Sequence, residues 1–255
     1  MDELSRLVSN ARALVLEGYY DLDDRLPMAP SFLESLGVAG QVSDVIAEIK
    51  FASPEGESGK PKSAFDGLLD RLVAARPLGL SVLAEPRVFG GHLDFVRRAA
   101  GKGLPVLMKD VVVDEAQIDA AAACGASAVL LIESIFQRDL VPEPSQAFID
   151  AAHDRGLDAI LEVHTLEEWD SAVGTDADIL GINNRDLATM EVDLGTTRRL
   201  LGARRKDRPT IAMSGIGHRD QVESMLRAGA DAVLVGSSIM AHEDPGKKLE
   251  ELLHG

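Results

Sequence analysis

The fold is most clearly indicated by residues 159–183, AILEVHTLEEWDSAVGTDADILGIN. The two ends of this stretch, 159–164 and 179–183, are short runs rich in Ile, Leu and Val that finish in polar residues. Such runs are typical of strands buried on both faces of a parallel sheet. Between them, 165–173 begins with a threonine and spaces its apolar residues along one face of a helix. The stretch therefore predicts a strand, a helix and a second strand of a parallel sheet.

The same alternation continues on both sides of this stretch. The expected strands are Val45–Phe51, Leu80–Glu85, Pro105–Lys109, Ala128–Glu133, Ala159–His164, Ile179–Asn183, Thr210–Ser214 and Ala232–Gly236. Helical patterns lie between them, at Ser63–Ala75, Asp114–Ala123, Ser145–Arg155, Thr165–Val173, Asp193–Leu201 and Arg219–Ala228. Eight such units without a long insertion predict a closed parallel barrel, a single (β/α)8 TIM barrel. An open doubly wound sheet is the alternative fold.

Residues 1–44 precede the first expected strand. They contain a helical pattern near Leu4–Glu17 that is partly apolar. We expect an N-terminal helical extension packed on the barrel, where it would cover the barrel bottom or mediate contact between chains. The predicted organisation is an extension over 1–44 and a catalytic barrel domain over 45–255, in a monomer or weak homo-oligomer.

The chain of 255 residues is strongly acidic, with a formal net charge of −16. Such a charge repels nucleic acid and anionic membranes, so neither is an expected partner. An anionic ligand must then be held by local features. The first ten residues have no apolar core, and no apolar run is long enough to span a membrane. We therefore expect a cytoplasmic protein.

Cysteine and histidine usage limits the metal chemistry. Cys124 is the single cysteine, which excludes a disulfide framework and a cysteine metal cluster. The six histidines show no metal-ligand spacing, so we expect no metal site. His164, at the end of an expected strand, is interpreted as a structural residue.

Charged side chains lie at the ends of the expected strands, which meet at the mouth of a barrel. They are Glu48, Lys50, Glu85, Lys109, Glu133 and Glu162. Glu48 and Lys50 share one face of their strand because side chains alternate. Burying an unpaired charge is unfavourable, so these groups must pair with one another or bind a ligand. The pattern favours an active site over a purely structural ion-pair network.

Two glycine-containing turns follow the last two expected strands. Ser214 and Gly215 follow the seventh strand, and Gly236 and Ser237 follow the eighth. Barrels frequently bind phosphate at these two turns, through backbone N–H groups that glycine leaves accessible. Ser53, just after the first strand, adds a hydroxyl. We therefore expect a small phosphorylated substrate.

Six ordered motifs, which span most of the barrel, carry a resemblance to a known family. They are AEIK at 47–50 with SP at 53–54, SVLAEP at 81–86 with FGG at 89–91, PVLMKD at 105–110, LEVH at 161–164, GINNRDL at 181–187 and VGSSIM at 235–240. In this order the chain resembles the indole-3-glycerol-phosphate synthases of tryptophan biosynthesis. The resemblance implies conversion of 1-(2-carboxyphenylamino)-1-deoxyribulose 5-phosphate to indole-3-glycerol phosphate, with loss of CO2 and water and without a cofactor.

The resemblance also implies roles for residues of this chain. Lys109 would be the general acid of ring closure, and Glu162 the acid or base of the dehydration. Lys50 would contact anionic groups of the substrate, and Glu48 would pair with the lysines. The substrate would be positioned by Asn183, Arg185 and Phe89, and its phosphate held by Ser53, Ser214, Gly215, Gly236 and Ser237.

The chain departs from the family pattern at three places. The family usually has Glu-Ser-Gly after the seventh strand, where this chain has Met213-Ser214-Gly215. Glu55 and Glu57 add charge to the loop after the first strand, and Val111 stands where the family commonly has an aromatic residue. Met213 leaves an alternative open, namely a paralogue with a changed substrate or reaction, or a catalytically weak binding protein. A phosphoribosylanthranilate isomerase is disfavoured because Cys124 is expected within a helix.

Overall fold

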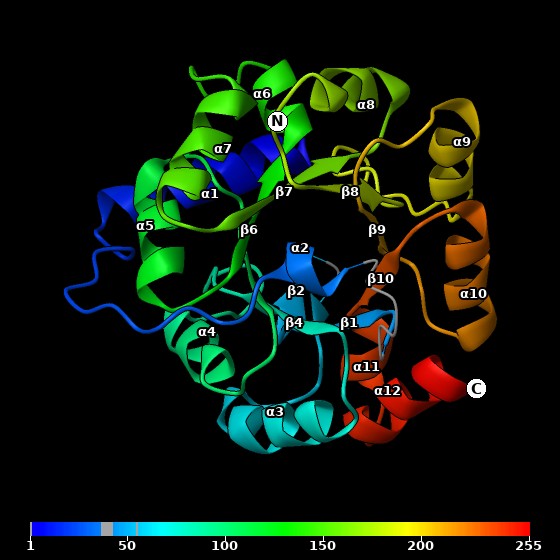
Figure 1. Cartoon of the computed structure of the whole chain (residues 1–255). Helices are drawn as coiled ribbons and strands as arrows, with labels where there is room; N and C mark the ends of the chain where they lie inside the picture. Colours follow the sequence, from blue (N-terminus) through cyan, green and yellow to red (C-terminus); the bar gives the residue numbers. More distant parts are fainter. Residues whose placement is uncertain (1, 37–42, 55) are drawn as a thin grey trace.

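The computed structural model describes residues 2–36, 43–54 and 56–255 and forms a closed barrel of eight parallel strands (Figure 1). The barrel strands are β1 (Val45–Ile49), β4 (Gly79–Leu83), β5 (Val106–Lys109), β6 (Ala128–Ile132), β7 (Asp158–Val163), β8 (Ile179–Asn183), β9 (Thr210–Met213) and β10 (Ala232–Val235). Each pairs with its neighbour in this order, and β1 also pairs with β10. The predicted barrel is confirmed, and the open sheet is wrong because the first and last strands hydrogen-bond to each other.

A layer of helices surrounds the barrel, as Figure 1 shows. Its members are α3 (Phe65–Ala74), α4 (Leu93–Ala100), α5 (Glu115–Ala123), α6 (Glu133–Gln137), α7 (Ser145–Asp154), α8 (Leu166–Val173), α9 (Gly195–Ala203), α10 (Arg219–Ala228), α11 (Ser237–Ala241) and α12 (Pro245–His254). Side-chain caps begin several of them. Thr165 accepts from the amide of Glu168, and Asp114 from the amide of Ala116, which satisfies N–H groups that the first helical turn leaves unpaired.

The first strand is shorter than expected, and the reason lies in its hydrogen bonds. The sequence predicts a strand to Phe51, whereas β1 ends at Ile49. The amide of Phe51 donates to the Phe89 carbonyl instead of continuing the barrel ladder. The chain then turns through the short antiparallel pair β2 (Ala52–Ser53) and β3 (Gly56–Glu57), so Lys50 leads from the barrel into a loop over its mouth.

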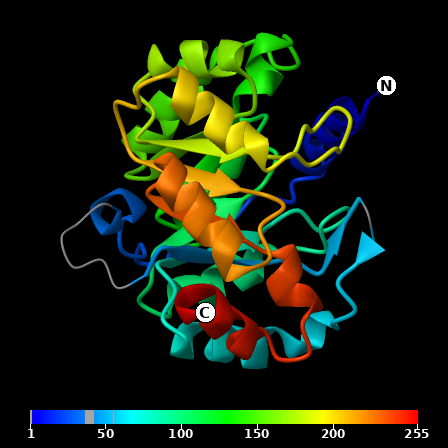
Figure 2. The same cartoon turned by 90° about the vertical axis from the view of Figure 1, so that its right-hand side faces the viewer.

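The segment before β1 contacts both ends of the barrel. Helix α1 (Glu3–Leu16) and the β2–β3 pair lie at one end, and α2 (Phe32–Ser35) lies at the other (Figure 2). A Cβ at Gly79, the first residue of β4, would lie 2.5 Å from the Phe32 ring, so Phe32 packs directly on the strand starts. The expected N-terminal helix therefore lies at the mouth, and a second short helix covers the bottom. The domain boundary at residue 44 stays a prediction.

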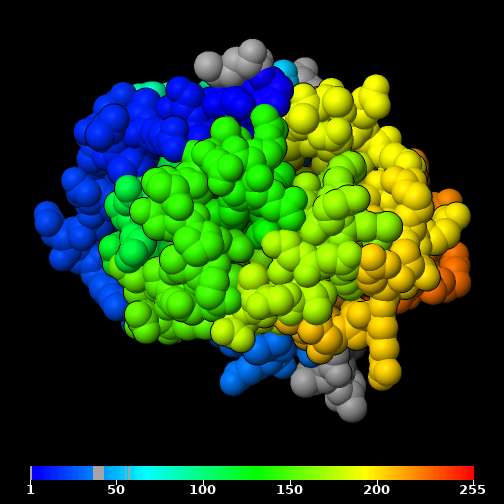
Figure 3. Space-filling model, turned by 90° about the horizontal axis from the view of Figure 1, so that it is seen from above, coloured from blue at the N-terminus to red at the C-terminus, as the bar shows by residue number. Residues whose placement is uncertain are grey.

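Helix α1 also rests against the segment that follows β6, as seen from above in Figure 3. Arg138 donates to the Asp2 carboxylate at 2.5 Å, and Arg12 donates to the Leu140 carbonyl. The apolar face of α1, which includes Leu4, Leu7 and Leu14, is buried. Burial of this face against the barrel fixes α1 over one side of the mouth. Within the described ranges, no helix is both long and apolar enough to cross a membrane.

Candidate active site

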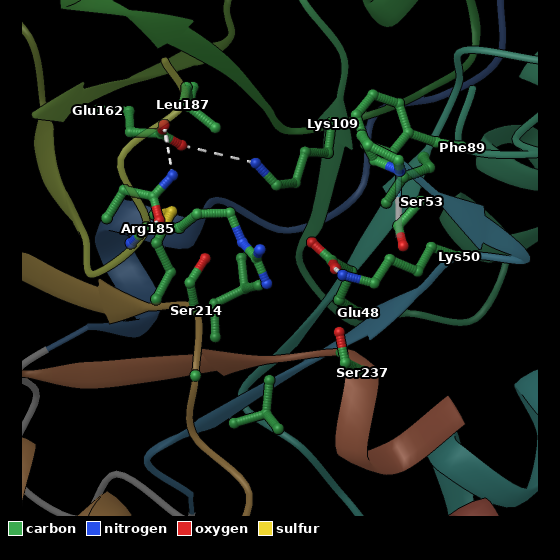
Figure 4. Close-up of a pocket in the computed structure, with 18 of the residues that line it drawn as sticks. Glu48, Lys50, Ser53, Phe89, Lys109, Glu162, Arg185, Leu187, Ser214 and Ser237 are labelled. Atoms are coloured by element: carbon green, nitrogen blue, oxygen red, sulfur yellow. Dashed lines mark hydrogen bonds and ion pairs between the residues drawn. The ribbon is translucent and has the colours of Figure 1, made fainter. Parts of the chain in front are cut away.

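A cavity of about 300 Å³ opens at the C-terminal ends of the strands (Figure 4). Every residue to which the family resemblance gives a role lines this cavity, although the strands that carry them are far apart in the chain. They are Glu48, Lys50, Ser53, Phe89, Lys109, Glu162, Asn183, Arg185, Ser214, Gly215, Gly236 and Ser237. Parallel strands of a closed barrel place all their carboxyl ends at one mouth, which explains the convergence.

Glu48 and Lys50 form an ion pair on one wall of the cavity. The Lys50 Nζ lies 2.9 Å from Glu48 Oε1, and Glu48 is 4% exposed. Burial opposes ionisation of Glu48, but the positive charges of Lys50, Lys109 and Arg185 outweigh it and hold the pKa of this carboxyl below its ordinary value. Glu48 is therefore an anion, and its negative charge stabilises the cationic groups around the cavity.

Glu162 and Lys109 form a second charged pair in the cavity, with Glu162 on the side away from Lys50 (Figure 4). The Lys109 Nζ lies 3.6 Å from Glu162 Oε2, and Glu162 is 3% exposed. Within the described chain, Glu162 Oε2 has no hydrogen-bond partner. Because a buried carboxylate oxygen normally has one, this atom is poised to bind a donor from a ligand.

Asn183 fixes the orientation of Glu162. Its Nδ2 donates to Glu162 Oε1 at 2.8 Å, and its Oδ1 accepts from the amide of Arg185 at 2.9 Å. The Arg185 amide can only donate and the carboxylate of Glu162 accepts, so these partners determine which way the Asn183 side-chain amide points. One carboxylate oxygen of Glu162 is thus held by the protein, and the other is directed toward Lys109.

Apolar side chains form the rest of the wall. They are Leu7, Leu83, Val111, Ile132, Leu187, Met190, Met213, Ile216, Leu234 and Val235. Met213 pairs with Asn183 in the strand register and is 2% exposed. Its methyl group lies where Gly181 has no side chain, since a Cβ there would be 2.7 Å from Met213 Cε. A wall of this kind suits a flat aromatic group.

The two glycine turns close the remaining side. Ser214 and Gly215 both have positive φ, 70° and 78°, and a Cβ on Gly215 would lie 2.5 Å from Val192. A Cβ on Gly236 would overlap the Glu48 carboxylate. Ser238 Oγ donates to the Ile216 carbonyl at 3.2 Å and joins the two turns. Glycine at 236 is thus needed for the Glu48–Lys50 pair as well as for access to the turn.

Sequence reasoning did not assign most of the apolar wall, or Asp110, to the cavity. Leu7 reaches it from α1, and the apolar spacing of that helix was the available signal. Asp110 lines it beside Lys109, is 3% exposed and accepts a hydrogen bond from the Tyr20 hydroxyl at 2.8 Å. Burial raises the pKa of Asp110 to about 7.

Three charged or polar residues at the strand ends lie outside this cavity. Glu133 begins α6, and its Oε1 accepts from the Ser171 hydroxyl at 2.6 Å. His164 Nδ1 lies 2.7 Å from the Asn183 carbonyl, beside an adjoining hollow of about 130 Å³. Glu85 turns into the loop that follows it. Glu55 and the side chain of Glu57 lie outside the described part of the structure.

The family model for indole-3-glycerol phosphate synthase matches residues 9–252. The chain belongs to the indole-3-glycerol phosphate synthase family. An indole-3-glycerol phosphate synthase of Methanocaldococcus jannaschii is 34% identical over 250 residues, which cover 97% of this chain and 91% of that protein. One from Lactiplantibacillus plantarum is 40% identical over 214 residues, covering 83% and 80%.

A solved structure agrees on the fold alone. The thiamine phosphate pyrophosphorylase from Pyrococcus furiosus superimposes with a TM-score of 0.59 at 20% identity, covering 82% of this chain and 93% of that one. Within the indole-3-glycerol phosphate synthase family, the quoted motifs now have positions in space. The lysines of AEIK and PVLMKD face one cavity, and the departure at Met213 forms part of its apolar wall.

Proposed function

We propose that the chain converts 1-(2-carboxyphenylamino)-1-deoxyribulose 5-phosphate to indole-3-glycerol phosphate, a lyase step of tryptophan biosynthesis that releases CO2 and water. The observation that carries this proposal is the convergence of Lys109 and Glu162, 3.6 Å apart, in a cavity with an apolar wall on one side and two glycine turns on the other. An acid, an aromatic-binding wall and a phosphate-binding turn are the parts that this reaction requires.

Lys109 acts in the first chemical step. The ring carbon that bears the carboxylate attacks the ketone carbon, and the Lys109 ammonium donates a proton to the ketone oxygen as the new C–C bond forms. The carboxylate then leaves as CO2, and the electron pair of the broken C–C bond restores the aromatic ring. Lys50, held by Glu48, contacts the anionic groups of the substrate.

Glu162 acts in the dehydration. The hydroxyl formed in the first step leaves as water after it receives a proton, and a base removes the remaining proton to give the indole. A carboxyl group with one oxygen held by Asn183 and the other directed into the cavity can carry out such transfers. Asn183 therefore keeps the reactive oxygen of Glu162 in place.

Local charge binds the substrate despite the acidic surface. Lys50, Lys109 and Arg185 face the cavity, and Arg185 suits a carboxylate because its guanidinium can donate two parallel hydrogen bonds. The phosphate is held by the hydroxyl of Ser53 and by the two glycine turns. The residues of these turns are Ser214, Gly215, Gly236 and Ser237, of which Ser237 begins α11. We further propose a monomer or weak homo-oligomer located in the cytoplasm.

The test is turnover of this substrate, followed by indole fluorescence. The wild-type protein gives signal, and Lys109→Ala and Glu162→Gln both lose it, by about 10²–10⁴-fold as expected for general acid–base groups. A silent wild-type protein at high enzyme concentration, with Lys109→Ala equally silent, would overturn the proposal.

Met213 favours a second candidate, a paralogue or weak enzyme on the same barrel. The thioether cannot supply the carboxylate that the family pattern has at this strand end. Met213→Glu is expected to raise turnover if the missing carboxylate limits the reaction. Unchanged or abolished turnover in Met213→Glu would contradict the idea that a missing carboxylate limits the reaction. High turnover by the unmodified protein would exclude a weak enzyme.

A further inference from the structure

Glu85 is a buried carboxylate whose four hydrogen bonds all turn it away from the cavity. It follows β4 by two residues and is 1% exposed. Its Oε1 accepts from Asn10 Nδ2 at 2.8 Å and from the Arg87 amide at 2.7 Å. Its Oε2 accepts from the amides of Val88 and Phe89, at 2.6 and 2.9 Å. Three successive backbone amides thus surround one carboxylate.

These bonds determine where Phe89 lies. A carboxylate that accepts consecutive N–H groups holds the backbone in a concave turn. Phe89 lines the cavity, and its carbonyl accepts from the amides of Phe51 and Ala52, at 3.2 and 3.0 Å. Those two residues stand between Lys50 and Ser53. Phe89 therefore connects the Glu85 carboxylate to the segment that carries Lys50 and Ser53.

The fourth bond connects the carboxylate to α1. Asn10, which donates it, lies one helical turn after Leu7, and Leu7 lines the cavity. Arg87, in the same turn as the three amides, pairs with Glu17 just beyond α1. Two segments that form the cavity wall, α1 and the turn after β4, meet at Glu85, and the Phe89 carbonyl joins that turn to the loop after β1.

We propose that Glu85 is a positioning residue for substrate binding, which sets the Phe89 ring and the loop of Ser53 against the substrate. This inference rests on the proposed function. Glutamine has the same shape but cannot replace it, because its NH2 group would face two of the four donors. Glu162 lies on β7, away from this turn. Lys109 is close to it, but its backbone is held by the amide of Ala84, which donates to the Lys109 carbonyl at 3.0 Å, a bond that does not involve the Glu85 side chain. We therefore expect both residues to keep their geometry when Glu85 is changed.

The experiment measures kcat and KM for the carboxyphenylamino-deoxyribulose phosphate in Glu85→Gln, at a temperature where the protein is folded. We expect KM to rise about tenfold with kcat within about threefold, as expected when hydrogen bonds to a charged group are lost. Glu133→Gln is the matched control, since Glu133 is a carboxylate 2% exposed at another strand end and does not line the cavity. It should lower stability without changing KM.

A double-mutant cycle tests whether Glu85 acts through Phe89. If it does, Glu85→Gln raises KM far less in a Phe89→Ala background than in wild type. Equal effects in both backgrounds, or a wild-type KM in Glu85→Gln, would overturn the proposal and leave a purely structural role. Glu85→Asp keeps the charge and is expected to give an intermediate KM, which supplies the test if Glu85→Gln does not fold.

Amide hydrogen exchange separates this proposal from the proposed function. Exchange at Val88, Phe89, Phe51 and Ala52 should accelerate in Glu85→Gln and stay as in wild type in Glu133→Gln. If wild type shows no turnover but this exchange pattern holds, the reaction assignment fails and the positioning of the cavity wall stands. Unchanged exchange at all four amides refutes the positioning.

Discussion

At the scale of single residues, the site depends on close contacts that tolerate little change. Gly236 is an example, because its α-hydrogen faces the Glu48 carboxylate and a methyl group would overlap it. The sequence predicts a glycine turn here for reasons of phosphate access. The requirement imposed by Glu48 depends on the register of β1 against β10, which residue order alone does not reveal.

Gly236→Ala is therefore expected to displace Glu48 from Lys50. We expect kcat/KM to fall at least about tenfold and the free energy of unfolding to fall by about 1–3 kcal/mol, the usual effect of overpacking. Gly202→Ala is the control, because a methyl group at this position of α9 would meet no neighbouring element within 4 Å and alanine favours a helix. Steady-state kinetics and urea unfolding measure both effects, and full activity in Gly236→Ala would contradict the argument.

At the scale of elements, the buried pair of Tyr20 and Asp110 joins the N-terminal segment to the end of β5. Asp110 also accepts from the amide of Val111 at 2.7 Å, and Gln117 Nε2 donates to the Tyr20 hydroxyl at 3.4 Å. Burial raises the pKa of Asp110 from 3.8 to about 7. The folded chain therefore keeps a proton that the unfolded chain releases near pH 4.

This difference predicts how stability depends on pH. Because the folded state binds the extra proton, the contribution of Asp110 to stability is present below about pH 4 and is lost as pH rises through about 7. Asp110→Asn cannot titrate and lacks this loss. The unfolding free energy of wild type should drop relative to Asp110→Asn between pH 5 and pH 8, as measured by urea titration. A difference that stays constant over this range would contradict the prediction.

The positions of the barrel elements follow from the sequence because each strand is a short continuous apolar run, whereas the apolar residues of each helix repeat at helical spacing. Strand ends were less predictable. Glu133 was expected to end a strand and instead begins α6, and Phe51 leaves the ladder to bond Phe89. The hydrogen bonds of Asn10 with Glu85, and of Tyr20 with Asp110, join residues 75 and 90 positions apart, and local patterns carry no signal for such contacts.

At the scale of the whole molecule, the net charge of −16 opposes the charge of the cavity. Exposed charges are screened once the Debye length is short, whereas partly buried groups such as Lys50 and Lys109 are screened less. Salt therefore weakens the global repulsion of an anionic substrate more than it weakens the local attraction.

The KM for the phosphorylated substrate should consequently fall as NaCl rises from ~10 mM to ~150 mM, where the Debye length shortens from about 30 Å to about 8 Å. Initial rates at a series of substrate concentrations measure this change. An equal osmolarity of sucrose serves as the control and should leave KM unchanged. A KM that rises steadily with salt would show that the local cations dominate at all distances.

The segment that reaches both ends of the barrel has a consequence for biosynthesis. The Asn10 side chain donates to Glu85, and the amide of Leu26 donates to the Ala123 carbonyl. The amide of Leu33 donates to Asp158 at the start of β7. These residues must therefore wait for partners translated roughly ten seconds later, at common elongation rates. Until those partners have been translated, the apolar face of α1, with Leu4, Leu7 and Leu14, has no complete surface on which to pack.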